Sequence, residues 1–277
     1  MKPTEPGIYR DIPNDEYHAG KGLSSSGIKK MLDSPLHYWA AYLSPERVKE
    51  QKDCFDFGTA YHTYVLEPDK FSQTIAVIPE GIDRRTKAGK AAWEAFQSES
   101  AGKVCIKQPD MAAIEGMAAA VTSHPTASKI FHSGEAETSF YWIDEETGVL
   151  CKVRPDFYRQ GLMIADLKSS QNASPSAFSR DCAKFGYHIS AAFYLDGLAA
   201  HGDDLEGNFT FVVHEKTYPY ALACYVIADE AIALGRSLYK KALRTFSECQ
   251  DSGLWPGYEE NITYIDVPRW AYTQNED

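Results

Sequence analysis

The spacing of hydrophobic residues predicts that the first half of the chain is mainly helical. Apolar side chains recur every three or four positions in several stretches, as they do on the buried face of a helix. Three serines at 24–26 provide N-cap candidates for the first stretch, and Pro35 separates it from the second. We therefore expect helices after Ser26, after Pro35, and over residues 56–67, 88–100 and 110–122.

The pattern changes to short β-rich runs after residue 137. Residues 138–143 and 149–158 are rich in β-branched and aromatic side chains and flank a polar turn that contains glycine, so we expect a hairpin. The remaining expected elements are a strand over 162–168, helices over 174–183 and 187–200, strands over 209–214 and 220–227, and a helix over 229–250.

This order of elements predicts an α/β fold, in which a small mixed β-sheet is flanked by helices. Internal repeats and long flexible linkers are lacking, which favours a single domain over residues 1–277. We interpret residues 1–22, approximately, as an arm and residues from about 254 to 277 as a tail. Each segment could contact another subunit or fold back on its own domain.

Charged side chains gather on two of the expected strands. Asp156 follows Pro155 in the hairpin, and Asp166 and Lys168 lie two positions apart, so they share one face of a strand while Leu167 is buried on the other. Neighbouring carboxylates repel each other, and a divalent cation is the usual remedy. Oxygen ligands suit Mg²⁺ or, as a substitute, Mn²⁺. The alternative is a turn aspartate beside a solvated strand pair.

The spacing of Pro155-Asp156, Asp166 and Lys168 resembles the signature of the PD-(D/E)XK nucleases. The resemblance implies a restriction-endonuclease-like core in which Asp156 and Asp166 bind metal. It also implies that the Leu167 carbonyl is a further metal ligand and that Lys168 positions the attacking water.

Two further segments are similar to the RecB-like branch of that superfamily. His62 matches a histidine that joins the metal shell, and its alternative is a structural histidine at the edge of an apolar stripe. Glu137 matches an acidic position that often completes the carboxylate set, with Glu135 as a less favoured substitute. The alternative for Glu137 is an exposed strand residue.

The helix expected over residues 187–200 is similar to one that carries Gln-x-x-x-Tyr in the RecB-like branch, where it is implied to contact DNA. Tyr194 matches the tyrosine, whereas Ser190 stands in place of the glutamine. Serine is shorter than glutamine and could act only through water. Tyr194 could instead be an ordinary core tyrosine.

From residue 7 to about 272 the chain resembles the RecE-type exonucleases, the nuclease domain of exodeoxyribonuclease VIII. The matching stretches occur in the same order and include Gly7–Tyr9, Tyr17–Gly20, Asp56–Ala60, Arg84–Thr86, Arg154–Asp156 and Trp255-Pro256. The resemblance implies a Mg²⁺-dependent 5′→3′ exodeoxyribonuclease that degrades one strand of double-stranded DNA from an end. It implies 3′ single-stranded overhangs for phage or prophage recombination, a RecT-like single-strand annealing partner and a homo-oligomeric toroid.

A function of a different class is a catalytically silent DNA-end-binding or assembly module with the same fold. Ser190 is the feature that favours this alternative, and the intact set of Asp156, Asp166 and Lys168 speaks against it.

The net charge of −11, from 28 basic and 39 acidic residues, excludes a protein that coats nucleic acid by bulk attraction. It allows an enzyme with a local basic groove. Together with the resemblance, one cluster of cations within seven residues predicts contacts with DNA phosphates: Arg84, Arg85, Lys87 and Lys90. A solvated helix face is the alternative. Lys29 and Lys30 are weaker candidates.

The six cysteines are widely spaced and lack the patterns that bind zinc or an iron–sulfur cluster, so we expect neither cofactor. The chain also lacks an apolar run long enough to span a bilayer, and its first residues do not resemble a signal peptide. We expect a cytoplasmic protein without membrane contact.

Overall fold

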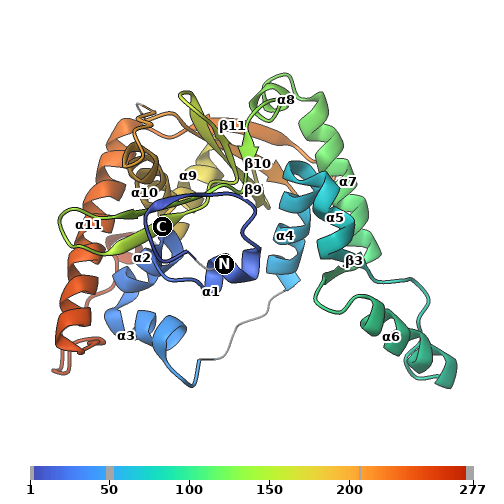
Figure 1. Ribbon diagram of the computed structural model, residues 1–277, viewed down its shortest axis with the longest axis horizontal. Coiled ribbons are helices and arrows are strands. Elements are labelled where there is room, and N and C mark those ends of the chain that lie inside the picture. Colours follow the sequence, from blue (N-terminus) through green and yellow to red (C-terminus); the bar gives the residue numbers. More distant parts are fainter. Residues whose placement is uncertain (1–2, 48–52, 206, 273–277) are drawn as a thin grey trace.

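The computed structural model describes residues 3–47, 53–205 and 207–272. Two main β-sheets and one small sheet are flanked by helices (Figure 1), so the predicted fold class is confirmed. Among the described helices, none combines the length and the apolar character needed to cross a membrane.

The larger sheet carries most of the predicted catalytic positions. Its strands are β5 (Glu135–Ala136), β8 (Phe157–Arg159), β9 (Met163–Ser170), β10 (Phe209–Glu215) and β11 (Leu222–Val226). They lie in the order β11-β10-β9-β8-β5. The central β9–β10 pair is parallel, and the other pairs are antiparallel. Asp166 and Lys168 therefore lie on a strand in the middle of the sheet.

The second sheet pairs the N-terminal segment with the hairpin in the middle of the sequence. Its strands are β1 (Gly7–Tyr9), β2 (Leu23–Ser24), β6 (Ser139–Ile143) and β7 (Leu150–Val153). They lie in the order β1-β6-β7-β2, with β2 parallel to β7. A short helix, α1 (Asn14–Ala19), connects β1 to β2. The described part of the predicted arm thus packs against its own domain, while residues 1–2 lie outside the description.

One group of helices covers one face of the larger sheet. It consists of α2 (Ser25–Asp33), α3 (Pro35–Tyr38) with a π-helical turn over Trp39–Leu43, α9 (Pro175–Phe185), α10 (Tyr187–Ala199) and α11 (Asp229–Ser252). Figure 1 shows α10 and α11 side by side, and they form one of the largest contacts between elements. Ile164 on β9 and Phe211 on β10 point into the hydrophobic core beneath these helices.

A second group of helices covers the other face. It consists of α4 (Asp53–Leu66), α5 (Pro68–Thr74), α6 (Lys87–Glu99), α7 (Gln108–Ser123) and α8 (Ala127–Ile130), with the two-stranded sheet of β3 (Ile75–Val77) and β4 (Val104–Ile106). Ala165 and Leu167 on β9 belong to the core on this side. Alternate residues of β9 therefore enter opposite cores, as the period of a strand requires. The predicted separation of Leu167 from Asp166 is confirmed.

The prediction of one continuous strand over residues 149–158 was wrong. It is two strands, β7 and β8, which belong to different sheets. Pro155 lies between them and has no N–H group to continue the ladder. The preceding strand segment breaks at Glu137, whose φ of 52° is left-handed. The hairpin therefore passes from one sheet to the other at Glu137 and Asp156.

The beginning of the predicted tail folds back on its own domain. The Trp255 ring stacks on Tyr38 at 5.6 Å and contacts Phe246, and the Pro256 carbonyl accepts a hydrogen bond of 3.0 Å from the Leu36 amide. The chain then runs exposed to α12 (Arg269–Tyr272). This exposed stretch carries large apolar side chains at Tyr258, Ile262, Tyr264, Ile265 and Val267. Residues 273–277 lie outside the description.

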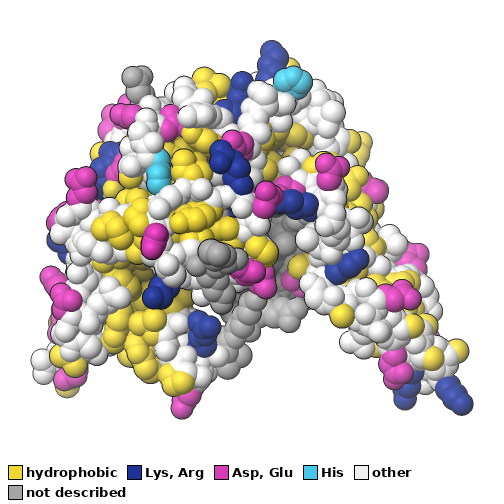
Figure 2. Space-filling view, viewed as in Figure 1, with side chains coloured by type: hydrophobic (Ala, Val, Ile, Leu, Met, Phe, Trp, Pro, Cys, Tyr) yellow, Lys and Arg dark blue, Asp and Glu magenta, His cyan; other side chains and the backbone are white. Residues whose placement is uncertain are grey.

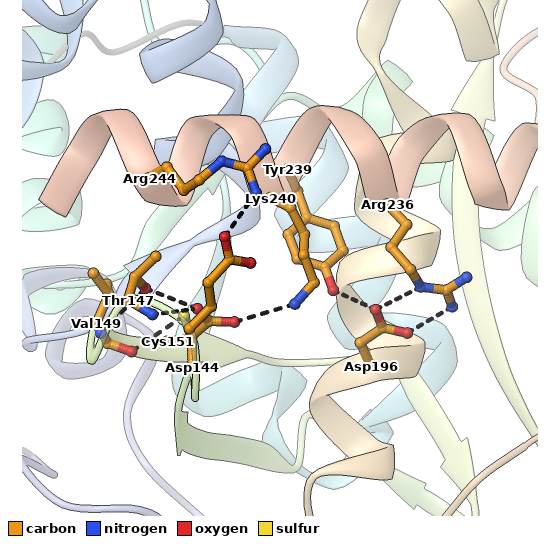
Figure 3. Close-up of polar contacts among 10 residues, drawn as sticks. Asp144, Thr147, Val149, Cys151, Asp196, Arg236, Tyr239, Lys240 and Arg244 are labelled. Atoms are coloured by element: carbon orange, nitrogen blue, oxygen red, sulfur yellow. Dashed lines mark hydrogen bonds and ion pairs between the residues drawn. The ribbon is translucent and has the colours of Figure 1, made fainter. Parts of the chain in front are cut away.

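Charged side chains of α11 tie this helix to α10 and to the turn that follows β6 (Figure 3). The Asp196 carboxylate accepts two hydrogen bonds from Arg236, at 2.6 and 2.7 Å, and one from the Tyr239 hydroxyl. About two turns after Arg236, Arg244 donates to Glu146 at 2.9 Å. Asp196 is the more enclosed of these two carboxylates, with 26% of its side chain exposed against 45% for Glu146.

We predict that Asp196→Asn lowers the free energy of unfolding by about 2 kcal/mol, because bidentate charge-assisted hydrogen bonds to a partly buried carboxylate are lost. Glu146→Gln removes a more exposed ion pair and should cost less than about 1 kcal/mol. Urea denaturation of both variants measures the difference. Equal losses would show that burial does not set the strength of these contacts.

Candidate active site

Three side chains that could hold a metal ion meet where the two main sheets join. His62 lies on α4, Glu137 between β5 and β6, and Asp156 between β7 and β8. One ligand atom from each residue lies within 4.8 Å of those of the other two. His62 Nδ1 is 3.5 Å from Asp156 Oδ2. The structure thus brings together three of the predicted metal ligands from three separate parts of the chain.

A backbone hydrogen bond fixes the Asp156 carboxylate. The ladder between β8 and β9 extends only to the pair Phe157 and Ala165. Beyond that pair, the Leu167 N–H group donates to Asp156 Oδ2 at 2.7 Å. The aspartate side chain therefore takes the place of the missing strand partner, and the carboxylate is held against β9. The role of the Leu167 carbonyl as a metal ligand stays a prediction.

The position of His62 follows from the anchoring of its neighbour on α4. Tyr61 is fully buried, and its hydroxyl donates a hydrogen bond of 2.7 Å to Nδ1 of His214 on β10. His214 Nε2 in turn donates to the Tyr220 carbonyl at 3.0 Å. Burial lowers the pKa of His214 to about 4, so its ring is neutral at physiological pH. This hydrogen bond fixes the rotation of α4 about its own axis. The adjacent His62 consequently lies against Asp156.

Glu137 combines a strained backbone with a buried charge. Its φ of 52° lies in the left-handed region, which is unfavourable for residues other than glycine. Burial and the nearby Asp156 charge raise the pKa of Glu137 to about 8. Glu135, the less favoured substitute, instead accepts hydrogen bonds of 2.7 and 2.8 Å from Arg10. Glu137 is therefore the glutamate that joins His62 and Asp156.

Asp166 and Lys168 form an ion pair on the neighbouring stretch of β9. Asp166 is only 6% exposed, and burial raises the pKa of its carboxyl group. Burial acts to lower the pKa of Lys168, but the Asp166 and Asp156 carboxylates outweigh it, so this pKa is raised and the ammonium stays charged. Asp156 is close enough to raise the pKa of Asp166 as well. In the structure Asp166 turns to Lys168, beside the group of His62, Glu137 and Asp156.

Ser190 and Tyr194 on α10 lie on the same side of the sheet as Asp166. Both line a cavity of about 170 Å³ that also borders Asp166 and Lys168. Ser190 Oγ accepts hydrogen bonds from Ser25 at 2.7 Å and from Lys29 at 3.3 Å. The predicted positions thus adjoin the site. Their contact with DNA stays a prediction.

The sequence pattern did not identify the residues that fasten the N-terminal segment beside this site. Arg154 lies over the Tyr17 ring at 4.1 Å and donates to the Ile12 carbonyl at 3.0 Å. Lys152 donates to the carbonyl groups of Tyr17 and Gly20 at 2.6 and 2.8 Å. Both cations are buried. Two cations, Lys152 and Arg154, in a strand predicted to be largely buried were the available signal, because a buried cation requires nearby acceptors.

The cluster predicted to bind DNA lies on a different part of the molecule. Its members are on α6 and the loop before it, and α6 projects from the body (Figure 1). The tip of this projection carries Lys and Arg side chains in Figure 2. Arg85 donates two hydrogen bonds to Asp83, at 2.9 and 3.0 Å, and Arg84 stacks on the Trp93 ring at 3.4 Å. DNA binding by Arg84, Arg85, Lys87 and Lys90 stays a prediction.

The donor set of the site fits a hard divalent cation. Carboxylate oxygens and an imidazole are typical ligands of Mg²⁺ and Mn²⁺, with water and phosphate oxygens completing the shell. A cation held by these residues would also offset the Asp156 charge, which adds to burial in raising the pKa of Glu137. The arrangement can therefore bind a metal ion next to a charged lysine and a cavity.

Comparisons with known proteins agree with this geometry. The comparison with curated proteins found no match. A solved structure from Eubacterium rectale, named "Putative exonuclease", is similar with a TM-score of 0.62 at 13% sequence identity, covering 96% of this chain and 100% of that chain. That likeness shows a shared fold. A family described as "PDDEXK-like domain of unknown function (DUF3799)" matches residues 24–268. The chain belongs to this family, and thereby to the PD-(D/E)XK nuclease superfamily.

Proposed function

We propose that this protein is a Mg²⁺-dependent exodeoxyribonuclease of the RecE type. The observation that carries the proposal is the meeting of His62, Glu137 and Asp156 next to the Asp166–Lys168 pair. Membership of the PDDEXK-like family supports a nuclease, and the name of the E. rectale protein supports an exonuclease.

Each residue of the site has a defined task in phosphodiester hydrolysis. His62, Glu137, Asp156 and Asp166 would hold Mg²⁺, which when bound supplies positive charge for the transition state. Lys168 would orient the attacking water, since its ammonium stays charged and lies at the cavity. Asp166 keeps this ammonium in place through their ion pair. The Leu167 amide holds Asp156 in the orientation that the cluster requires.

We further propose that the enzyme degrades one strand of double-stranded DNA in the 5′→3′ direction and leaves 3′ overhangs. A RecT-like annealing protein would take up these overhangs during recombination, and a toroid of identical subunits would enclose the duplex. The support for direction, partner and assembly is the resemblance of residues 7–272 to RecE-type exonucleases.

The alternative, a silent DNA-end-binding module, rests on Ser190 in place of the family glutamine. The structure gives Ser190 two hydrogen-bonded neighbours at the cavity, which favours a retained active site over a decayed one. Binding of a duplex end without nucleotide release would support the silent module.

We predict that Asp166→Asn and Lys168→Ala each reduce nucleotide release from linear duplex DNA in Mg²⁺ by about 100-fold or more, because preorganised charge at the reacting phosphate is lost. Asp251→Asn and Lys241→Ala, on the exposed surface of α11, are the matched controls. Thermal unfolding establishes that the variants fold. Full activity in either folded site variant contradicts the assignment.

We predict that Glu137→Gln stabilises the metal-free protein at pH 7 by about 1–3 kcal/mol. The pKa of Glu137 is raised from 4.5 to about 8 in the folded protein. The unfolded state therefore loses this proton at a lower pH than the folded state. As a result, the free energy of unfolding falls as the pH rises from 4.5 to about 8. Glutamine removes this part of the pH dependence. Glu115→Gln, on an exposed position of α7, is the control.

The same variant tests metal binding without an activity assay. Mg²⁺ should raise the melting temperature of the wild-type protein more than that of Glu137→Gln, because the wild type gains a ligand and loses repulsion. An equal Mg²⁺ effect on both proteins would show that Glu137 is no ligand.

We predict that linear duplex DNA labelled at its 5′ ends loses label as mononucleotides at the start of the reaction, whereas a 3′ label stays in long single strands. A gel of both substrates over time measures this. Early loss of the 3′ label would overturn the proposed direction, and cleavage of closed circles would overturn the requirement for a DNA end; either result leaves a nuclease.

A further inference from the structure

The cavity beside the Asp166–Lys168 pair has a second cationic wall. Lys29, on the first turns of α2, lines it together with Lys168, Tyr187 and Ser190. The two lysine ammonium groups lie over one aromatic ring: Nζ of Lys168 is 5.2 Å and Nζ of Lys29 is 6.0 Å from the centroid of Tyr187. Two cations are therefore gathered around one ring in a cavity of about 170 Å³.

The two lysines differ in their charge partners. Lys168 pairs with the Asp166 carboxylate. Lys29 forms no ion pair with a carboxylate among the residues that the structure describes, and its hydrogen-bond acceptor is the neutral hydroxyl of Ser190 at 3.3 Å. Burial, and then repulsion by Lys168, lower the pKa of Lys29 to about 8. The Asp166 carboxylate offsets this only in part, and an anionic ligand beside Lys29 would reduce the remaining cost of the half-buried ammonium.

Hydroxyl and amide groups suited to an anion surround Lys29. The Ser25 hydroxyl donates to Ser190 Oγ at 2.7 Å, so both oxygens lie within reach of the same small space. Ser24, Ser25 and Ser26 also line the cavity at the N-terminus of α2, a nine-residue helix. Helix N-termini favour negative charge. Donors from α2 and α10 thus converge on a point beside the ion pair.

We propose that Lys29, with Ser25 and Ser190, binds a phosphate group of the DNA strand other than the phosphodiester that is cleaved. Lys29 is then a positioning residue: it holds the strand so that the scissile phosphate meets Lys168 and the metal site. This inference rests on the proposed nuclease function.

The phosphate could be a terminal 5′-phosphate or an internal phosphodiester. Duplexes with a 5′-phosphate and with a 5′-hydroxyl separate these sources. A terminal site predicts that Lys29→Ala weakens binding of the 5′-phosphorylated duplex alone, whereas an internal site predicts equal weakening of both duplexes.

The test measures DNA binding by fluorescence anisotropy with the Asp166→Asn protein, which is expected to bind without cutting. Adding Lys29→Ala should raise the Kd about tenfold and reduce the slope of log K against log salt by about one, as loss of one phosphate contact requires. Lys29→Arg should restore much of the affinity. Lys241→Ala, an exposed lysine of α11, is the control.

Kinetics in the otherwise wild-type protein complete the test. Lys29→Ala should raise KM much more than it lowers kcat, and the effect of Mg²⁺ on the melting temperature should stay unchanged. Unchanged Kd, KM and salt slope in a folded Lys29→Ala protein overturn the inference even if the enzyme cuts DNA. Weaker DNA binding in a protein that never cuts leaves the phosphate site standing and removes the nuclease proposal.

Discussion

Repulsion between carboxylates is the constraint on which the rest of the site depends. Burial raises the pKa of Glu137 and of Asp166, and the nearby Asp156 charge adds to both rises. The fold holds these carboxyl groups where the two main sheets join. Glu137 and Asp156 lie there between strands and outside the regular ladders. A backbone amide at Leu167 and the ammonium of Lys168 offset part of this repulsion. A divalent cation held by Glu137 and Asp156 would offset the remainder.

The acidic and basic side chains of the site lie in two separate groups. Acidic side chains and His62 gather at the joint of the sheets, while Lys168 and Lys29 gather over the Tyr187 ring in the adjoining cavity. β9 carries both parts, because Asp166 and Lys168 are two residues apart on one face. Such a surface suits the proposed phosphodiester substrate: the acidic part would hold metal at one phosphate, and the lysines would bind the neighbouring phosphate.

Local patterns in the sequence predict most of the helices correctly. They also predict that Asp166 and Leu167 point to opposite faces of β9. Both predictions depend only on the regular spacing of side chains along a helix or a strand. Pro155 marks the break in the sequence, although the β-forming residues on both sides of it predict one continuous strand. The backbone conformation of Glu137 and the hydrogen bond between Leu167 and Asp156 could not be predicted, since both arise from how two sheets meet. Lys29 ranked low because its partner, Ser190, lies 161 residues away.

The pairing of β1 and β2 with β6 and β7 also has a consequence for how the chain is made. Ile8 pairs with Phe140, and Leu23 pairs with Cys151, so β1 and β2 have no strand partner until more than 120 further residues have been synthesised. Lys152 and Arg154, which donate hydrogen bonds to the N-terminal segment, are synthesised later still. Contacts between such distant positions close slowly. During synthesis the β-forming residues of this segment therefore stay without their strand partners, and exposed to other chains, until residues 139–152 are available to pair with them.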